Sequence, residues 1–185
     1  MIPILSLWMP ILVSAVLVFV LSSILHMVLK YHQADYRKLP DEDSVRDAIH
    51  AAAPEPGIYH FPHCSSPKEM GEPHMIEKLK RGPVGLLTIM PNGVMNMGKY
   101  LGQWFLFIVV VSFFVAYIAG RTHAPGTSYI SIFRFVGTVS FMAYGVGALT
   151  DSIWKSAPWS NTFRTVMDGF LYALVTGGAF GWLWP

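Results

Sequence analysis

The segment from Gly57 to His74 holds three histidines and the only cysteine of the chain. His60 and His63 are separated by two residues, which is the spacing of one half of a structural zinc site. Adjacent side chains of an extended chain point to opposite faces, so His63 and Cys64 are poorly placed to bind one ion. The second ligand pair also lacks its usual spacing. We therefore expect no cofactor here, with Zn²⁺ on His60, His63, Cys64 and His74 as the alternative.

A second polar group lies within apolar runs of the sequence. Asp168 stands five residues into the run that begins at Phe163, where an unpaired carboxylate in a membrane is costly. Arg164 precedes it by one helical turn and can pair with it. We predict an intramembrane polar cluster of His26, Gln103, Arg164 and Asp168. Its structural interpretation is a hydrogen-bonded clasp between helices, and its functional interpretation is a proton- or ion-binding step.

Small residues recur every four positions along the same run. They are Thr165, Gly169, Ala173, Gly177 and Gly181. This spacing places them on one helix face, where small side chains let a second helix backbone approach closely. We predict a helix-packing seam, either within the protein or against a second protein. Gly137, Ala143 and Gly147 of the preceding run are the expected partners.

Four apolar runs must position these residues, and each is long enough to cross a hydrocarbon core of about 30 Å. They cover residues 10–29, 101–119, 129–149 and 163–184. Only 13% of the residues are charged, whereas soluble domains carry about a quarter. We predict an all-α integral membrane protein with four transmembrane helices. The first run is expected to be a retained anchor, because no Lys or Arg precedes it and no small-residue cleavage site follows.

Basic residues predict the orientation of these helices. Nine of the thirteen Lys and Arg residues lie between the first and second runs. Cytoplasmic loops carry an excess of such residues, so we expect that stretch in the cytoplasm and both termini outside. The membrane we expect is a bacterial inner membrane.

The stretch between the first two runs is too polar to enter a bilayer. We divide the chain into an anchor (1–30), a cytoplasmic insert (31–99) and a three-helix region (100–185). Within the insert, a helix is expected from Asp41 to Ala53, with Asp41 as its cap. Short strands are expected at 57–61 and around 84–90, with a short helix between them. This makes a small α+β insert whose core is marginal at its size; a loosely ordered connector is the alternative.

The sequence contains no P-loop, nucleophile elbow, H-E-x-x-H or dinucleotide motif. The net charge of +2 gives no reason to expect a nucleic-acid partner. The leading prediction is a non-enzymatic accessory or scaffold protein that docks partners through the small-residue seam and the insert. It would form homo- or hetero-oligomers in the lipid bilayer. The alternatives are a small transporter or proton/ion-conducting unit using Asp168 with His26, and a metal-dependent membrane enzyme using the histidines of the insert.

Overall fold

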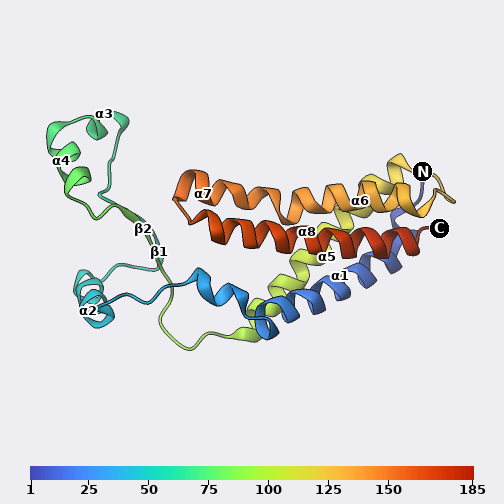
Figure 1. Cartoon of the computed structure of the whole chain (residues 1–185), viewed down its shortest axis with the longest axis horizontal. Helices are drawn as coiled ribbons and strands as arrows, with labels where there is room; N and C mark the ends of the chain where they lie inside the picture. Colours follow the sequence, from blue (N-terminus) through green and yellow to red (C-terminus); the bar gives the residue numbers. More distant parts are fainter. The chain divides into compact units, whose positions relative to one another are not determined.

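The computed structural model describes all 185 residues, Met1 to Pro185. The chain forms two compact units (Figure 1). One is a helical bundle made of residues 1–37 and 96–185, and the other is an insert made of residues 38–95. Residues 31–37 and 96–99, which we expected in the insert, therefore belong to the bundle.

The bundle is built from four long helical stretches. In chain order its elements are η1 (Ile4–Leu7), α1 (Trp8–Ser23), the π-helical turn η2 (Ile24–Val28), η3 (Tyr31–Asp35), α5 (Met97–Thr122), α6 (Tyr129–Tyr144), η4 (Val146–Ala148), α7 (Leu149–Lys155) and α8 (Trp159–Trp182). The backbone amide of Ile2 donates to the carbonyl of Gly120, and that of Gly126 donates to the carbonyl of Pro185. Both chain ends therefore lie at the same end of the bundle (Figure 1).

Three stretches are long and apolar enough to cross a membrane: Ile4–Val28, Met97–Thr122 and Tyr129–Lys155. The predominantly helical prediction is confirmed. The predicted count of four spans is not, because α8 does not reach the same apolar composition. It has 24 residues, but Arg164, Asp168 and its glycines and threonines lower its hydropathy.

The small-residue seam of α8 packs against α6 within the bundle. A Cβ atom added at Gly169 would lie 2.5 Å from the Cα atom of Gly145, and one at Gly177 would lie 2.9 Å from the carbonyl oxygen of Phe133. The backbones of α6 and α8 are therefore as close as glycine allows. Of the other seam residues, Ala173 is buried and faces Gly137, whereas Thr165 is exposed.

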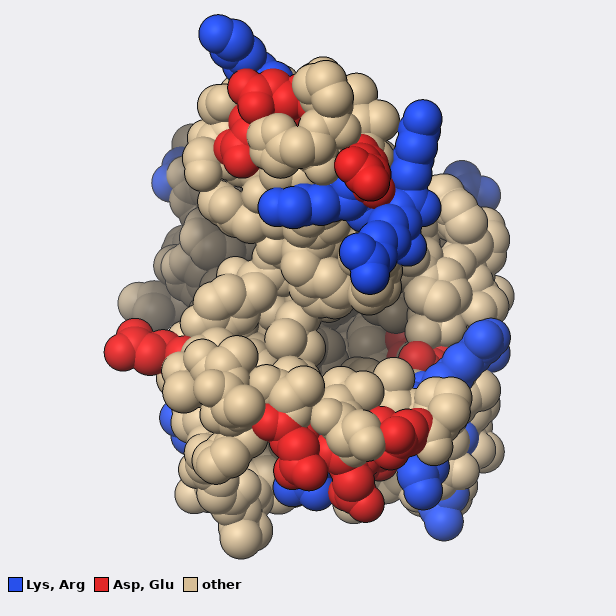
Figure 2. Space-filling view, turned by 90° about the vertical axis from the view of Figure 1, so that its left-hand side faces the viewer, with Lys and Arg blue, Asp and Glu red and all other residues tan.

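The insert contains the predicted helix, the two predicted strands and the predicted second helix. These are α2 (Glu42–Ala52), β1 (Gly57–Phe61), β2 (Gly85–Ile89) and α4 (Pro73–Arg81), with an additional short helix α3 (Pro67–Met70). Asp41 caps α2 by accepting a hydrogen bond from the amide of Ser44, and β1 pairs with β2 in antiparallel register from Gly57 opposite Ile89. Met75 is the only buried residue of the insert. Figure 2 shows acidic side chains gathered in the lower part of the view and basic side chains gathered above its centre, with both kinds elsewhere on that face.

Candidate functional site

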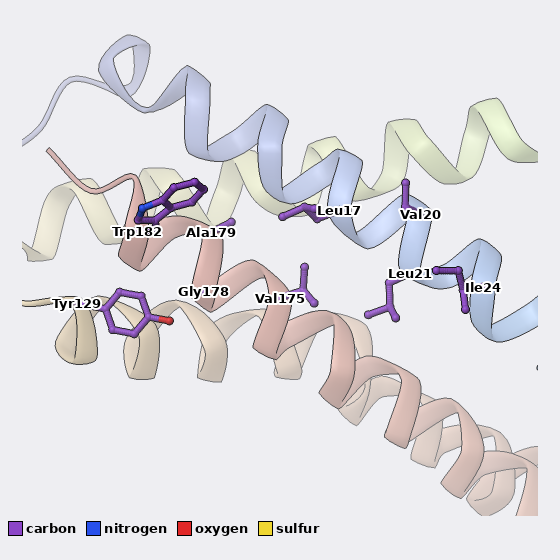
Figure 3. Close-up of a pocket in the computed structure, with 9 residues that line it drawn as sticks. All are labelled: Leu17, Val20, Leu21, Ile24, Tyr129, Val175, Gly178, Ala179 and Trp182. Carbon is purple, nitrogen blue, oxygen red and sulfur yellow. The ribbon is translucent and has the colours of Figure 1, made fainter.

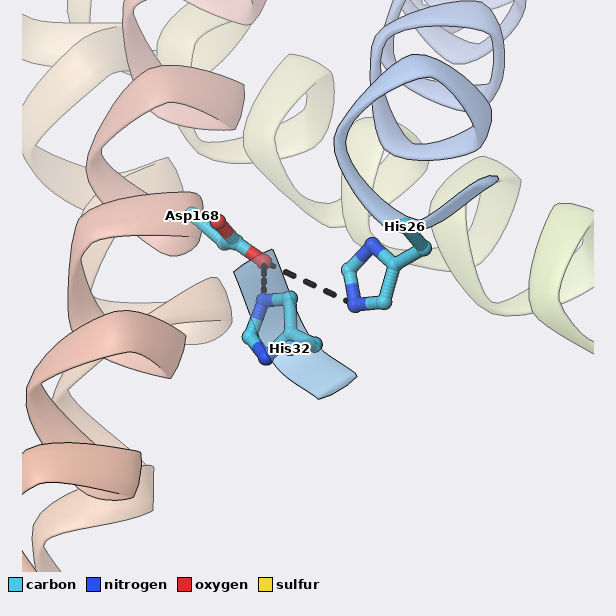
Figure 4. A group of neighbouring side chains, drawn as sticks. All are labelled: His26, His32 and Asp168. Atoms are coloured by element: carbon cyan, nitrogen blue, oxygen red, sulfur yellow. Dashed lines mark hydrogen bonds and ion pairs between the residues drawn. The ribbon is translucent and has the colours of Figure 1, made fainter. Parts of the chain in front are cut away.

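Two histidines and a carboxylate meet at one end of the bundle (Figure 4). His26 lies in the π-helical turn η2 that ends the first long helix, and such turns occur frequently at functional sites. Lys30 then adopts a left-handed conformation with φ of 53°, and the chain turns into η3, which carries His32. As a result the rings of His26 and His32 stack, with centroids 4.4 Å apart and planes 9° from parallel.

Both histidines approach the same oxygen of Asp168. The Nε2 atom of His32 lies 2.8 Å from Oδ2 of Asp168, and Nε2 of His26 lies 3.6 Å from that oxygen (Figure 4). The side chains of Asp168 and His32 are 5% and 14% exposed, whereas that of His26 is 49% exposed. The site is therefore closed around the carboxylate and open to its surroundings at His26.

The outer nitrogen of each histidine already has a hydrogen-bond acceptor. Nδ1 of His26 donates to the carbonyl oxygen of Ser22 at 3.1 Å, and Nδ1 of His32 donates to Oδ2 of Asp35 at 2.5 Å. A neutral imidazole carries one N–H group, so in the tautomer with that hydrogen on Nδ1 each ring leaves a lone pair on Nε2. Nε2 of His32 is also within hydrogen-bond distance of Oδ2 of Asp168, at 2.8 Å, so the ring donates to Asp168 when its hydrogen is on Nε2 and offers a lone pair there when it is on Nδ1.

Asp35 supports this arrangement from the outside of His32. Arg164 donates from Nη1 to Oδ1 of Asp35, and the side-chain amide of Asn161 donates from Nδ2 to the backbone carbonyl of Asp35 at 3.0 Å. Burial acts to raise the pKa of the Asp35 carboxyl, but its hydrogen bonds with His32 and Arg164 outweigh that effect and hold the pKa below its ordinary value. Asp35 is therefore ionised and fixes the orientation of the His32 ring.

The structure brings together only part of the predicted polar cluster. His26 and Asp168 meet as expected. Arg164 does not pair with Asp168, because its guanidinium reaches Asp35 instead. Gln103 is exposed, since the depth of a residue does not determine the helix face on which it lies. The hydrogen bond from α5 to α1 is made by the neighbouring Trp104, which donates from Nε1 to the hydroxyl of Ser22 at 2.9 Å.

His32 and Asp35 were missed by the sequence analysis, which placed them in the insert. The signal was present in the sequence "HQAD", which puts a histidine and a carboxylate directly after the first apolar run. Polar residues that directly follow an apolar run can reach the same site as polar residues within the run, so both kinds are candidates for one cluster.

The four residues considered for zinc in the insert are not brought together. His60 and His63 are exposed, and Nδ1 of His60 contacts the carbonyl oxygen of Pro62 at 3.0 Å. His74 faces Glu72, with Nδ1 3.3 Å from Oε2, and Cys64 is a free thiol. The residues that do lie within reach of a single ion are His26, His32 and Asp168.

An apolar groove lies elsewhere on the bundle, between α1 and α8 (Figure 3). It has a volume of about 580 Å³ and is lined by residues such as Leu17, Ile24, Val175 and Trp182. Its lining contains no titratable group except Tyr129. The groove can accommodate hydrocarbon, but it carries no groups for chemistry.

The chemistry available at the His26, His32 and Asp168 site follows from its donor atoms. Imidazole nitrogen and carboxylate oxygen are the ligands used for zinc and for other divalent transition metals such as iron and nickel. Their ligating atoms all lie within 4.8 Å of one another. No protein family, curated protein or solved structure matches the chain.

Proposed function

We propose that this is an integral membrane protein that binds a divalent transition-metal ion through His26, His32 and Asp168. The observation that carries the proposal is the convergence of two imidazole nitrogens and a carboxylate oxygen, which all lie within 4.8 Å of one another. With the hydrogen of each ring on Nδ1, all three atoms are acceptors and a cation between them stabilises the group.

The surroundings of the two rings favour a metal ion as that cation. Metal-binding histidines donate their second N–H group to a carboxylate or a backbone carbonyl, which fixes the ring and raises its basicity. Both kinds of acceptor occur here, because Asp35 accepts from Nδ1 of His32 and the carbonyl of Ser22 accepts from Nδ1 of His26. Three protein ligands would leave a further coordination position for water or a substrate.

A second candidate function is proton binding by the same residues, in line with the proton- or ion-conducting alternative from the sequence. His32 lies between two carboxylates, at 2.5 Å from Asp35 and 2.8 Å from Asp168. A doubly protonated imidazolium would donate to both. In that case His32 carries the cation itself and the site holds no metal.

Metal content decides between the two candidates. The protein is purified in lipid nanodiscs without chelator, incubated with Zn²⁺ or Fe²⁺, desalted, and analysed by inductively coupled plasma mass spectrometry. We expect one ion per chain, lost in His32→Ala and retained in the matched control His60→Ala. A parent protein without stoichiometric metal would exclude the metal proposal and favour the proton site. Equal loss in both variants would locate the ion elsewhere.

We propose further that α8 crosses the membrane as a fourth span, which keeps the predicted orientation with both termini outside and the insert in the cytoplasm of a bacterial cell. Support comes from the two chain ends, because Ile2 is hydrogen-bonded to Gly120 in the last turn of α5 and Pro185 to Gly126 in the α5–α6 connection that follows. The single cysteine of the chain, Cys64, lies in the insert and provides a direct measurement. A membrane-impermeant maleimide should label it only after the inner membrane is permeabilised. Labelling in intact spheroplasts would show the opposite orientation, with the insert outside and both termini in the cytoplasm.

The scaffold function and the homo- or hetero-oligomeric state stay predictions. The seam on α8 is occupied by α6 within the bundle, so docking of another protein through that seam is no longer favoured. If the protein docks a partner, the insert is the part of the chain that would do so. Crosslinking in intact membranes, with and without residues 38–95, tests this assignment.

A further inference from the structure

Four buried side-chain oxygen atoms of the bundle have no hydrogen-bond partner in the protein. They are Oγ of Ser140, the hydroxyl oxygens of Tyr144 and Tyr172, and Oδ1 of Asp168. All four belong to α6 and α8. Buried polar atoms almost always have a partner in the protein or an ordered water molecule, and an unsatisfied polar group is most costly where the surroundings are apolar. Four such atoms in one bundle call for a common explanation.

The residues that carry these atoms lie on successive turns of α8 (Asp168 and Tyr172) and of α6 (Ser140 and Tyr144). Tyr172 lies one helical turn beyond Asp168 on α8, and its ring meets that of Tyr144 edge-on, with centroids 5.7 Å apart. The hydroxyl of Tyr144 lies beside those of Ser112 and Thr176, without a hydrogen bond of normal geometry to either.

Further hydroxyl groups extend this series to the middle of the bundle. Ser14 of α1 donates to the hydroxyl of Ser112 at 3.2 Å, and both residues are fully buried. Ser140 lies one turn from Tyr144 on α6 and is also fully buried. The polar groups thus come from α1, α5, α6 and α8 and face the interior that these helices share.

Beyond these hydroxyls, towards the end that holds both chain termini, the interior is apolar. The buried residues there include Leu7, Ile11, Val115, Val136 and Phe180. Asp168 is the only charged residue along the polar series, so nothing in it is suited to hold a second ion deep in the bundle. Hydroxyl groups both donate and accept hydrogen bonds, which matches the bonding of water.

We infer that the oxygen atoms of Asp168, Tyr172, Tyr144 and Ser140, together with the hydroxyls of Thr176, Ser112 and Ser14, hold a file of bound water molecules. The file begins at the His26, His32 and Asp168 site and stops at the apolar layer around Phe180. Intramembrane polar residues characteristically face such water-filled interiors, and buried waters bridge groups that lack protein partners. Water therefore reaches the site from one side of the bundle only. This inference does not depend on a metal being bound.

Radiolytic hydroxyl-radical footprinting of the metal-free protein in lipid nanodiscs tests the file. Radicals formed from internal water oxidise neighbouring aromatic rings, whereas a ring in a dry interior is protected. We expect Tyr144 and Tyr172 to be oxidised at rates close to that of the exposed Tyr36 and well above that of Phe180, which is fully buried in the apolar layer. Rates as low as that of Phe180 would show that the interior is dry and would overturn the inference.

Thermal unfolding of Tyr172→Phe and Ser140→Ala, again without metal, provides a second test. Removing a hydroxyl that binds water should lower the midpoint of unfolding. Removing a hydroxyl that has no partner should leave the midpoint unchanged or raise it, and that result would contradict the water file. Ser160→Ala, at an exposed position of α8, is the matched control. Because the protein is metal-free in both tests, failure of the metal proposal leaves their outcome unaffected.

Discussion

The histidines of the bundle and those of the insert have different surroundings. His26 and His32 each have an outer hydrogen-bond acceptor and an inner contact with Asp168. The polar side-chain contacts of His60 and His74 are with a neighbour two residues away in the sequence. The histidines of the insert are close in sequence but are spread over its exposed surface. His32 and Asp168 are 136 positions apart in the sequence but are in contact.

The difference follows from packing. In the bundle, glycines bring α6 and α8 into close contact, so α8 presents Asp168 at a fixed position to the chain that follows α1. The insert buries Met75 alone, and two short strands and three short helices cannot fix four ligands around one point. A ligand set requires elements held in place by their own packing, and the bundle is the unit that has them.

The largest effect that tests this comparison is expected at Gly169. In Gly169→Ala the new methyl group would meet the backbone of Gly145 at 2.5 Å, which neither helix can relieve without separating. We expect a loss of about 3 kcal/mol in the free energy of unfolding, measured by denaturation in mixed micelles. The control is Gly71→Ala in the insert, where the methyl group meets only the carbonyl oxygen of Lys68 at an ordinary 3.5 Å. Similar losses in both variants would mean that the seam is not what orders the bundle.

A smaller effect is expected at the ion pair behind His32. In Arg164→Met, Asp35 loses the guanidinium that neutralises it, and His32 is held less firmly. We expect metal affinity to fall about 10–100-fold, as is typical for residues that support a ligand, in competition titrations with a chromogenic chelator. The matched control is Arg46→Met in the insert, whose pair with Asp43 is 3.7 Å long and exposed and should not affect affinity. An unchanged metal affinity in Arg164→Met would show that the pair of Arg164 and Asp35 does not support metal binding by His32.

The smallest effect concerns acid stability. Because the pKa of folded Asp35 lies below the ordinary value of 3.8, ionised Asp35 stabilises the fold at higher pH. That contribution is complete above pH 3.8 and is lost as the pH falls through the lower folded pKa. Asp35→Asn should therefore flatten the acid limb of a plot of unfolding free energy against pH in metal-free protein. Asp43→Asn, whose side chain is 93% exposed in the parent, should not. Parallel acid limbs in the parent and Asp35→Asn would refute the assignment.

The apolar runs and turn residues predicted much of the fold. Asp41 marked the start of α2, and the strands at 57–61 and 85–89 followed from their composition and the surrounding glycines and prolines. These features are local, so neighbouring residues are enough to indicate them. The apolar composition of α8 was overestimated because the cost of Arg164 and Asp168 was not weighed against its length.

The site was predictable only in part because it depends on the direction of the chain after α1. Asp168 and His26 stood out as polar residues in apolar runs. The turn at Lys30, which brings His32 back to Asp168, rests on a left-handed residue that is not glycine, and no sequence pattern signals it. Without that turn, pairing Arg164 with Asp168 one helical turn away was the simplest expectation. The turn also brings Asp35 close to α8, and Arg164 therefore pairs with Asp35 and not with Asp168.

The order in which His26, His32 and Asp168 are synthesised has a consequence for the biogenesis of the protein. α6, η4 and α7 are joined to α8 by three residues, Ser156 to Pro158, so the C-terminal hairpin forms from neighbouring segments. Asp168 is translated 136 residues after His32. A nascent chain therefore cannot assemble the site until α8 has formed and packed beside α1. Occupancy of the site would mark a chain that has folded as far as α8, and it would distinguish such molecules from those stalled at any earlier helix.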